Sequence, residues 1–347
     1  MRMAPNPSAS PKHSSAPPNP GLIFDTMNRY QHTMALKGAI ELEIFTHIGD
    51  GATSAAEIAK RSKASERGTR ILCDFLTIMG FLTKQDGAYG LTPESAMFLN
   101  KKSPAYMGSI TGFLTNDAMM NSFRDIAGLV RKGGTLLGGE GTVEAENPIW
   151  VEFARTMVPI VIMPAKMVAP IVGGTGRKKV LDVAAGHGMF GICVAEQNPS
   201  AEIVGLDWKN VLEVALENAK RAGIMDRYKT IAGSAFDVDL GTGYDVVLIP
   251  NFLHHFDAST NVTLLKRIRA AMNPGGQVAT IEFVPNEDRV TPPNAASFSM
   301  MMLGGTAGGD AYTFAELDGM FRAAGFGAST LQDLAPSPER LVLTKYA

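Results

Sequence analysis

Three short segments in the C-terminal half carry residues whose types and spacing suit the binding of a nucleoside. The first is DVAAGHG at residues 182–188, where small residues let a ligand approach the backbone closely. Asp207 ends the second, EIVGLD, where a carboxylate can accept hydrogen bonds from both ribose hydroxyls. The third contains Ser234 and Phe236, a polar side chain and an aromatic ring that suit the edge and face of an adenine. Together they predict a site for an adenosine-containing cofactor.

Two kinds of cofactor compete for the first segment. GHGMFG, from Gly186 to Gly191, followed by Asp207 about 20 residues later, has the spacing of a dinucleotide-binding fingerprint. A pyrophosphate favours positive dipoles without an adjacent carboxylate, whereas Asp182 stands just before these glycines. S-adenosylmethionine (SAM) has no phosphate, and a nearby carboxylate favours its ammonium and sulfonium charges. We therefore expect SAM.

His254 is the candidate for acid–base chemistry. It follows the apolar run DVVLIPNFL, so we expect it at the carboxyl edge of a sheet, beside the cofactor. Methyl transfer is an in-line displacement, and a phenol, whose pKa is about 10, needs a base to take its proton. The alternative is that His254 only packs or caps the next helix. Apart from the adjacent His255 the histidines are scattered, so we expect no metal site.

The length and composition of the chain indicate what kind of folded protein holds these residues in place. A chain of 347 residues, 45% of them hydrophobic, predicts two folded domains. The net charge of −2 gives no general field for nucleic acid. Cys73 and Cys193 are the only cysteines and suggest no disulfide framework, which fits a reducing cytoplasm. Residues 1–20 lack the apolar core of a signal peptide, and we expect a disordered tail there.

The remaining chain divides into three parts by pattern. Residues 21–110 have helical periodicity and then a hairpin turning at Asp86-Gly87, a winged-helix outline that we interpret as a packing or dimerisation module. Residues 111–173 form a helical connector, whose apolar stretch 149–173 contains charges and prolines that disfavour a membrane span. Residues 174–347 alternate strand and helix. The predicted fold class is α/β, a Rossmann-like sheet with helices on both faces and a mainly helical N-terminal domain.

The order of these motifs resembles the small-molecule O-methyltransferases of plants and bacteria that have an N-terminal dimerisation domain. The resemblance rests on DVAAGHG, GLDW, GSAF, NFLHHFD, NPGGQVATIEF and GGDAYTFAEL and covers nearly everything after Gly21. It implies a homodimer, a small-molecule acceptor and SAM as cofactor. By position, the cofactor contacts fall on Asp182, Gly186, Gly188, Asp207, Ser234 and Phe236. The catalytic base falls on His254, its orienting acid on Glu282, and the acceptor-lining positions on Phe153, Met157, Met302 and Thr306.

Some positions depart from the family pattern. Ala184 replaces a glycine, Ser234 replaces an acid, and Ala311 stands where the family has a second catalytic acid. The missing acid leaves open a sulfur, nitrogen or carbon acceptor, because a thiolate or thioether needs no phenol-deprotonating base. A basic excess between Ala52 and Lys84 leaves open a winged-helix regulator with a SAM-sensing domain.

Overall fold

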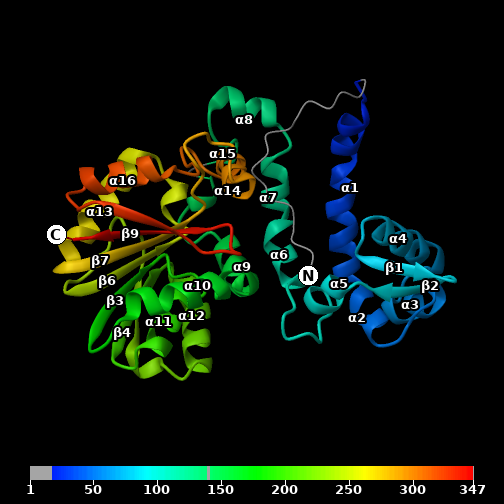
Figure 1. Cartoon of the computed structure of the whole chain (residues 1–347), viewed down its shortest axis with the longest axis horizontal. Coiled ribbons are helices and arrows are strands. Elements are labelled where there is room, and N and C mark those ends of the chain that lie inside the picture. The colour runs from blue at the N-terminus through cyan, green and yellow to red at the C-terminus, as the bar shows by residue number, and fades with distance from the viewer. Residues whose placement is uncertain (1–17, 139–140, 347) are drawn as a thin grey trace. The chain divides into compact units, whose positions relative to one another are not determined.

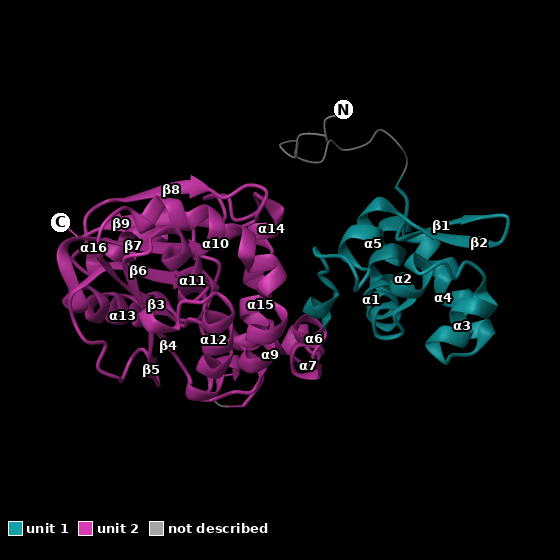
Figure 2. Cartoon of the chain, turned by 90° about the horizontal axis from the view of Figure 1, so that it is seen from below, with its two compact units in different colours: residues 1–111 teal, residues 112–347 magenta. Residues whose placement is uncertain are grey.

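The computed structural model describes residues 18–138 and 141–346, and residues 1–17 of the predicted tail lie outside this part. The chain divides between Thr111 and Gly112 into two compact units, coloured separately in Figure 2. Each unit has its own buried apolar core. The two units are therefore described one at a time.

The N-terminal unit is a helical bundle with one hairpin. Its elements are α1 (Gly21–Glu41), α2 (Ile44–Gly49), α3 (Ala55–Ser62), α4 (Glu66–Ile78), β1 (Leu82–Gln85), β2 (Ala88–Leu91) and α5 (Pro93–Phe98). Asp86 and Gly87 form the hairpin turn with positive φ values of 50° and 81°, which suit the twist of a two-residue hairpin. Ser54 and Glu57 form a capping box that fixes the start of α3. The predicted helix, turn, helix and hairpin are all present.

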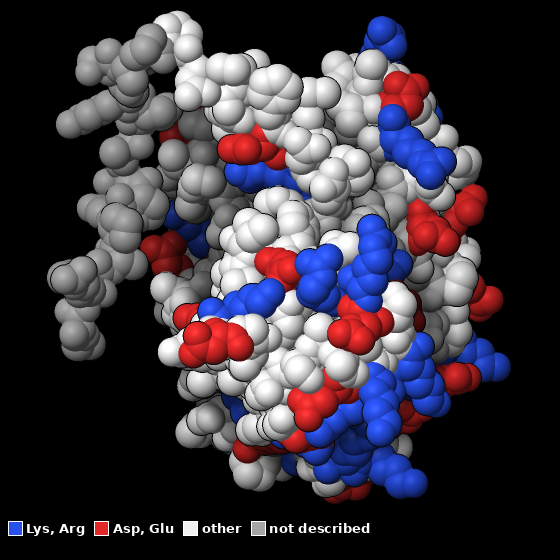
Figure 3. All heavy atoms as spheres, turned by 90° about the vertical axis from the view of Figure 1, so that its right-hand side faces the viewer, with Lys and Arg blue, Asp and Glu red and all other residues white. Residues whose placement is uncertain are grey.

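On the face that Figure 3 shows, Lys and Arg side chains lie among Asp and Glu side chains, although several of them adjoin one another near its lower edge. Arg70 and Lys84 both pair with Asp74, at 2.9 and 2.5 Å. Neutralised charges of this kind give little attraction for phosphates.

The second unit begins with a helical connector. Its helices are α6 (Thr111–Leu114), α7 (Asp117–Ser122), α8 (Ile126–Lys132), α9 (Ile149–Thr156) and α10 (Val158–Gly173). No single helix in the described ranges is long and apolar enough to cross a membrane; α9 and α10 meet that criterion only as a pair, and they are bent by 67°. Seven of the 16 residues of α10 are buried in the unit.

A seven-stranded sheet forms the centre of this unit, in the order β5-β4-β3-β6-β7-β9-β8. The strands are β3 (Lys178–Val183), β4 (Ala201–Asp207), β5 (Tyr228–Ala232), β6 (Tyr244–Pro250), β7 (Met272–Glu282), β8 (Ser329–Asp333) and β9 (Arg340–Lys345). Neighbouring strands from β5 to β7 are parallel, whereas β9 pairs antiparallel with both β7 and β8. The remaining helices are α11 (Met189–Gln197), α12 (Lys209–Arg221), α13 (Ala258–Ala271), α14 (Pro293–Ala296), α15 (Phe298–Gly305) and α16 (Phe314–Ala323).

Helices cover both faces of the sheet. One core contains residues of α10, α11 and α12, and the other contains residues of α13 and α16 (Figure 1). The predicted Rossmann-like fold is confirmed. The sequence patterns did not predict the edge strands β5 and β8, because each exposes most of its residues and lacks the apolar run of a central strand.

The chain reverses its direction of strand addition at β3. It places β4 and β5 on one side of β3, and β6 and β7 on the other. Loops leaving the carboxyl ends of β3 and β6 therefore diverge and open a crevice, which is where α/β sheets bind ligands.

Candidate active site

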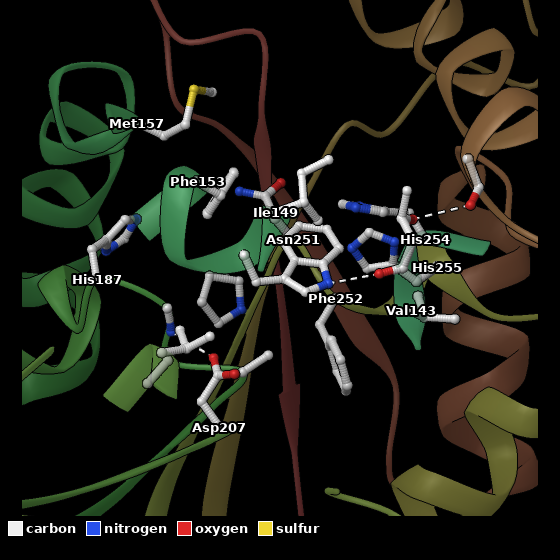
Figure 4. A pocket seen from close by; sticks show the side chains of 18 of the residues that line it. Val143, Ile149, Phe153, Met157, His187, Asp207, Asn251, Phe252, His254 and His255 are labelled. Carbon is white, nitrogen blue, oxygen red and sulfur yellow. Dashed lines mark hydrogen bonds between the residues drawn. The ribbon is translucent and has the colours of Figure 1, made fainter. Parts of the chain in front are cut away.

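A cavity of about 410 Å³ opens at this crevice, entirely within the second unit. Figure 4 shows Asp207 and His187 on one side of it and His254 and His255 on the other. We call the first side, with Gly186, Asp207, Ser234 and Phe236, the cofactor end. The acceptor end contains the two histidines, which Figure 4 shows, and the apolar side chains of α9 and α15 that line the same cavity.

Backbone amides hold the acid of the cofactor end in place. Asp207 closes β4, and its two carboxylate oxygens accept hydrogen bonds from the amides of Gly186 at 2.8 Å and Trp208 at 2.7 Å. Burial raises the pKa of Asp207 to about 6. Each carboxylate oxygen retains a further lone pair, so Asp207 can still accept hydrogen bonds from ribose hydroxyls. Ser234 and Phe236 line the same end.

Two predicted cofactor residues, Asp182 and Gly188, do not line the cavity. The Asp182 carboxyl is fully buried and accepts a hydrogen bond from the Gly191 amide at 3.0 Å. Its other oxygen has no hydrogen-bond partner within residues 18–138 and 141–346. Burial raises its pKa to about 8. Gly188 has a φ of 74°, and a Cβ there would lie 2.8 Å from the Tyr228 hydroxyl. Both residues therefore shape the loop from behind.

The cavity wall fits a cofactor without phosphates. None of the described residues that line it is Lys or Arg, so a pyrophosphate would find no cationic partner there. Asp207 suits a ribose, and Phe236 offers a ring for a nucleobase. A cofactor with an adenosine part and its own positive charge matches this set of groups, as SAM does.

His254 and Glu282 meet because β6 and β7 are neighbours. Glu282, at the end of β7, accepts the amides of Phe252 and Leu253 at 3.0 and 2.9 Å through Oε1. Its Oε2 lies 2.5 Å from Nδ1 of His254. A carboxylate accepts only, so Nδ1 carries the proton and Nε2 remains for a ligand. His254 lines the cavity and Glu282 stands behind it.

Three of the four predicted acceptor-lining residues reach the cavity: Phe153, Met157 and Met302. Thr306 does not. Its hydroxyl donates to the Met302 carbonyl at 2.8 Å and accepts from the Gly309 amide at 3.0 Å, so it terminates α15.

The sequence patterns missed several aromatic residues of the acceptor end. Trp150 packs its ring 5.7 Å from Phe153 and 5.1 Å from His255, measured between ring centroids, and its indole donates to the Thr142 carbonyl at 2.7 Å. Phe298 lies 4.8 Å from the ring of His254. An aromatic run near a predicted pocket helix, WVEF, was the available signal for Trp150.

A buried acid and an amide also line the cavity without having been predicted. Glu339, 3% exposed, accepts a hydrogen bond from the Asn251 amide at 2.6 Å and from the Ser337 hydroxyl at 3.1 Å. Burial raises its pKa. Ala311 is buried and can supply no acid, so Glu339 is an acid reaching this cavity from a different segment. No local pattern marks it, because it lies in the loop before β9.

Comparison with known proteins agrees with this geometry. The O-methyltransferase domain family matches residues 144–327, more than half of the chain, and the O-methyltransferase dimerisation domain family matches residues 24–101. A 3-hydroxy-5-methyl-1-naphthoate 3-O-methyltransferase from Streptomyces sahachiroi is 29% identical over 317 residues, covering 90% of this chain and 92% of that protein.

Solved structures give the same result. A crystal structure from Nostoc punctiforme, provisionally assigned as an O-methyltransferase, is 49% identical with a TM-score of 0.93, covering 95% of this chain and 100% of that one. Human N-acetylserotonin methyltransferase in complex with SAM shares the fold, with a TM-score of 0.80 at 20% identity, covering 97% and 100%. The predicted cofactor and enzyme class are confirmed, and the dinucleotide and regulator alternatives are not needed. This chain belongs to the O-methyltransferase family and is a SAM-dependent methyltransferase.

Proposed function

We propose that this enzyme methylates a hydroxyl oxygen of a small aromatic molecule, with His254 as the general base. The observation that carries the proposal is the His254 imidazole, which Glu282 fixes through Nδ1 and which lines an aromatic cavity. A thioether acceptor has no proton to lose and would make no use of a base held in this way.

The proposed step is a single displacement. When bound, SAM supplies a methyl carbon whose bond to sulfur breaks as the bond to the acceptor oxygen forms. His254 takes the hydroxyl proton on Nε2, and the Glu282 carboxylate stabilises the resulting imidazolium. Phe153, Trp150 and Phe298 position the acceptor ring and exclude water.

We also propose that the enzyme acts as a homodimer assembled through its N-terminal unit. Five large side chains of α1 are 61–72% exposed: Leu22, Ile23, Phe24, Met27 and Tyr30. Such a concentration of exposed apolar groups on one helix is typical of an interface. Light scattering should give twice the chain mass for the wild type and a smaller mass for Phe24→Ser with Met27→Ser; a monomeric wild type would contradict the proposal.

The reaction is tested by incubating the enzyme with methyl-labelled SAM and a panel of phenols, catechols, thiols, thioethers and amines, followed by mass spectrometry. Naphthols belong in the panel because a relative is named for a hydroxynaphthoate. Label on oxygen supports the proposal. Label confined to sulfur, nitrogen or carbon would overturn the oxygen acceptor while leaving the methyltransferase class intact.

A further inference from the structure

We infer that the acceptor carries a second oxygen beside the hydroxyl that is methylated, and that His255 donates a hydrogen bond to this second oxygen. The substrate class is then a hydroxy-carbonyl arene, with the hydroxyl ortho or peri to a carbonyl. The inference rests on the proposed role of His254 and extends it, because it concerns the neighbouring imidazole.

His255 differs from His254 in its partners. It lines the same cavity and is 8% exposed, yet neither ring nitrogen has a hydrogen-bond partner in the described part of the chain. Its Nδ1 is buried among protein atoms, so Nε2 is the nitrogen left for a ligand. Rings surround it: Trp150 at 5.1 Å, His254 at 4.3 Å and Phe252 at 6.4 Å, measured between centroids.

The position of its proton follows from this environment. Burial, with His254 beside it, holds the pKa of His255 well below the usual range, so the ring is neutral and has one donor and one acceptor nitrogen. An orphaned buried N–H is rarer and more costly than an unpaired acceptor, so the proton belongs on Nε2 rather than on the buried Nδ1. His255 therefore offers an N–H donor to the ligand.

The two neighbouring histidines thus present opposite groups. Nε2 of His254 presents a lone pair, because Nδ1 of the same ring carries the proton that Glu282 accepts. Nε2 of His255 presents an N–H donor, because its Nδ1 is buried without a partner in the described part of the chain. Their rings are 4.3 Å apart between centroids, so one compact group of the acceptor can meet both. The oxygens of a hydroxy-carbonyl unit lie about 2.5–3.0 Å apart, since the hydroxyl donates internally to the carbonyl.

This arrangement solves a chemical difficulty of such acceptors. The internal hydrogen bond holds the hydroxyl proton away from an external base. A donor from His255 to the carbonyl oxygen replaces that bond and frees the proton for His254. A simple phenol would instead leave the His255 donor unpaired within an aromatic wall.

The test uses two isomers that differ only in where the hydroxyl lies: methyl 3-hydroxy-2-naphthoate, with hydroxyl and carbonyl adjacent, and methyl 6-hydroxy-2-naphthoate, with the two remote. Binding of each is measured by calorimetry on enzyme loaded with S-adenosylhomocysteine, and turnover is measured with SAM. The variants are His255→Phe, which keeps a ring, His255→Asn, which keeps an N–H donor, and His187→Phe, a histidine replacement at the cofactor end.

We expect the wild type to bind the adjacent isomer about tenfold more tightly, the cost of one hydrogen bond to a ligand. His255→Phe should remove this preference, His255→Asn should restore part of it, and His187→Phe should affect both isomers alike. Equal or reversed preference in the wild type, an equal effect of His255→Phe on both isomers, or no binding of either would overturn the inference. Any label on a phenol oxygen in the panel would still leave the proposed reaction standing.

Discussion

The cofactor end and the acceptor end of the cavity satisfy their polar groups in different ways. At the cofactor end, backbone amides bind both carboxylate oxygens of Asp207 before any ligand arrives. At the acceptor end, His255 Nδ1 and Asn251 Oδ1 are buried without a hydrogen-bond partner among the described residues. The first end is set by the fold for one invariant ligand, whereas the second leaves groups whose pairing depends on the acceptor. The cofactor end is therefore the preorganised part of the cavity, and the acceptor end is the part that selects the substrate.

The largest effect should come from His254, which belongs to the acceptor end alone. We expect His254→Gln to lower kcat about 10²–10⁴-fold, since the amide cannot take the proton. SAM affinity, measured by calorimetry, should change by no more than about twofold. Unchanged turnover would remove the base role, and lost SAM binding would show that the two ends are not separate.

Asp207→Ala, at the cofactor end, should have the reverse effect: it should weaken SAM binding and leave kcat nearly unchanged. Hydrogen bonds to a charged group contribute about 1.5–3 kcal/mol, so SAM affinity should fall about 10–100-fold. With saturating SAM, kcat should stay within about threefold of the wild type, because the acceptor end keeps its contacts. A large fall in kcat at saturation would contradict the separation.

Asp182, which lies behind the cofactor loop, gives the stability of the fold a pH dependence. Burial raises its pKa to about 8, above the 3.8 of an unperturbed aspartate, so the folded state holds one more proton than the unfolded state between these values. The contribution of Asp182 to stability is complete below pH 3.8 and declines as the pH rises toward 8, at most by about 1.4 kcal/mol per pH unit.

Denaturant unfolding measured from pH 5 to 8 checks this prediction against Asp182→Asn, whose profile should be flatter over the same range. The asparagine can still accept the Gly191 amide, so the loop should survive. Parallel profiles for the two proteins would show that Asp182 ionises normally in the folded state.

The smallest effect should come from Glu339, which orients an amide at the acceptor end. Glu339→Gln keeps the size of the side chain but no longer obliges Asn251 to point its NH₂ group toward position 339. We expect the KM for the acceptor to rise about threefold with SAM affinity unchanged. Ser337→Ala removes the hydrogen bonds that the Ser337 hydroxyl makes with the Glu339 carboxylate and amide but leaves the one from Asn251, so it is the matched control and should have less effect.

The sequence predicted the cofactor end of the cavity better than the acceptor end. The central strands are buried on both faces, so each has an apolar run that predicts a strand. The edge strands β5 and β8 are mostly exposed and lack such a run, so the sequence did not predict them. Of the predicted cofactor residues, Asp207 is the last residue of β4, and Gly186 and Phe236 lie in the loops that follow β3 and β5. The carboxyl ends of parallel strands meet at one edge of a sheet, so these loops could be placed together.

The acceptor end resisted prediction because it is assembled from distant segments. Thr306 was expected to line the cavity, but its hydroxyl is engaged in the turn that ends α15, whereas the preceding residue, Gly305, lines the cavity. Glu339 joins Asn251 across 88 positions of the chain, through strand pairing that no local pattern reveals.

The sequence by itself determined the α/β class and predicted the cofactor loops and the candidate base, because these depend on local residue order and strand ends. Only the tertiary structure decided that Asp182 lies behind the loop, that Glu339 reaches the cavity and that Nδ1 of His255 has no hydrogen-bond partner in the described part of the chain. These facts depend on which side chains fill the space between elements, and packing of that kind is set by the whole fold at once.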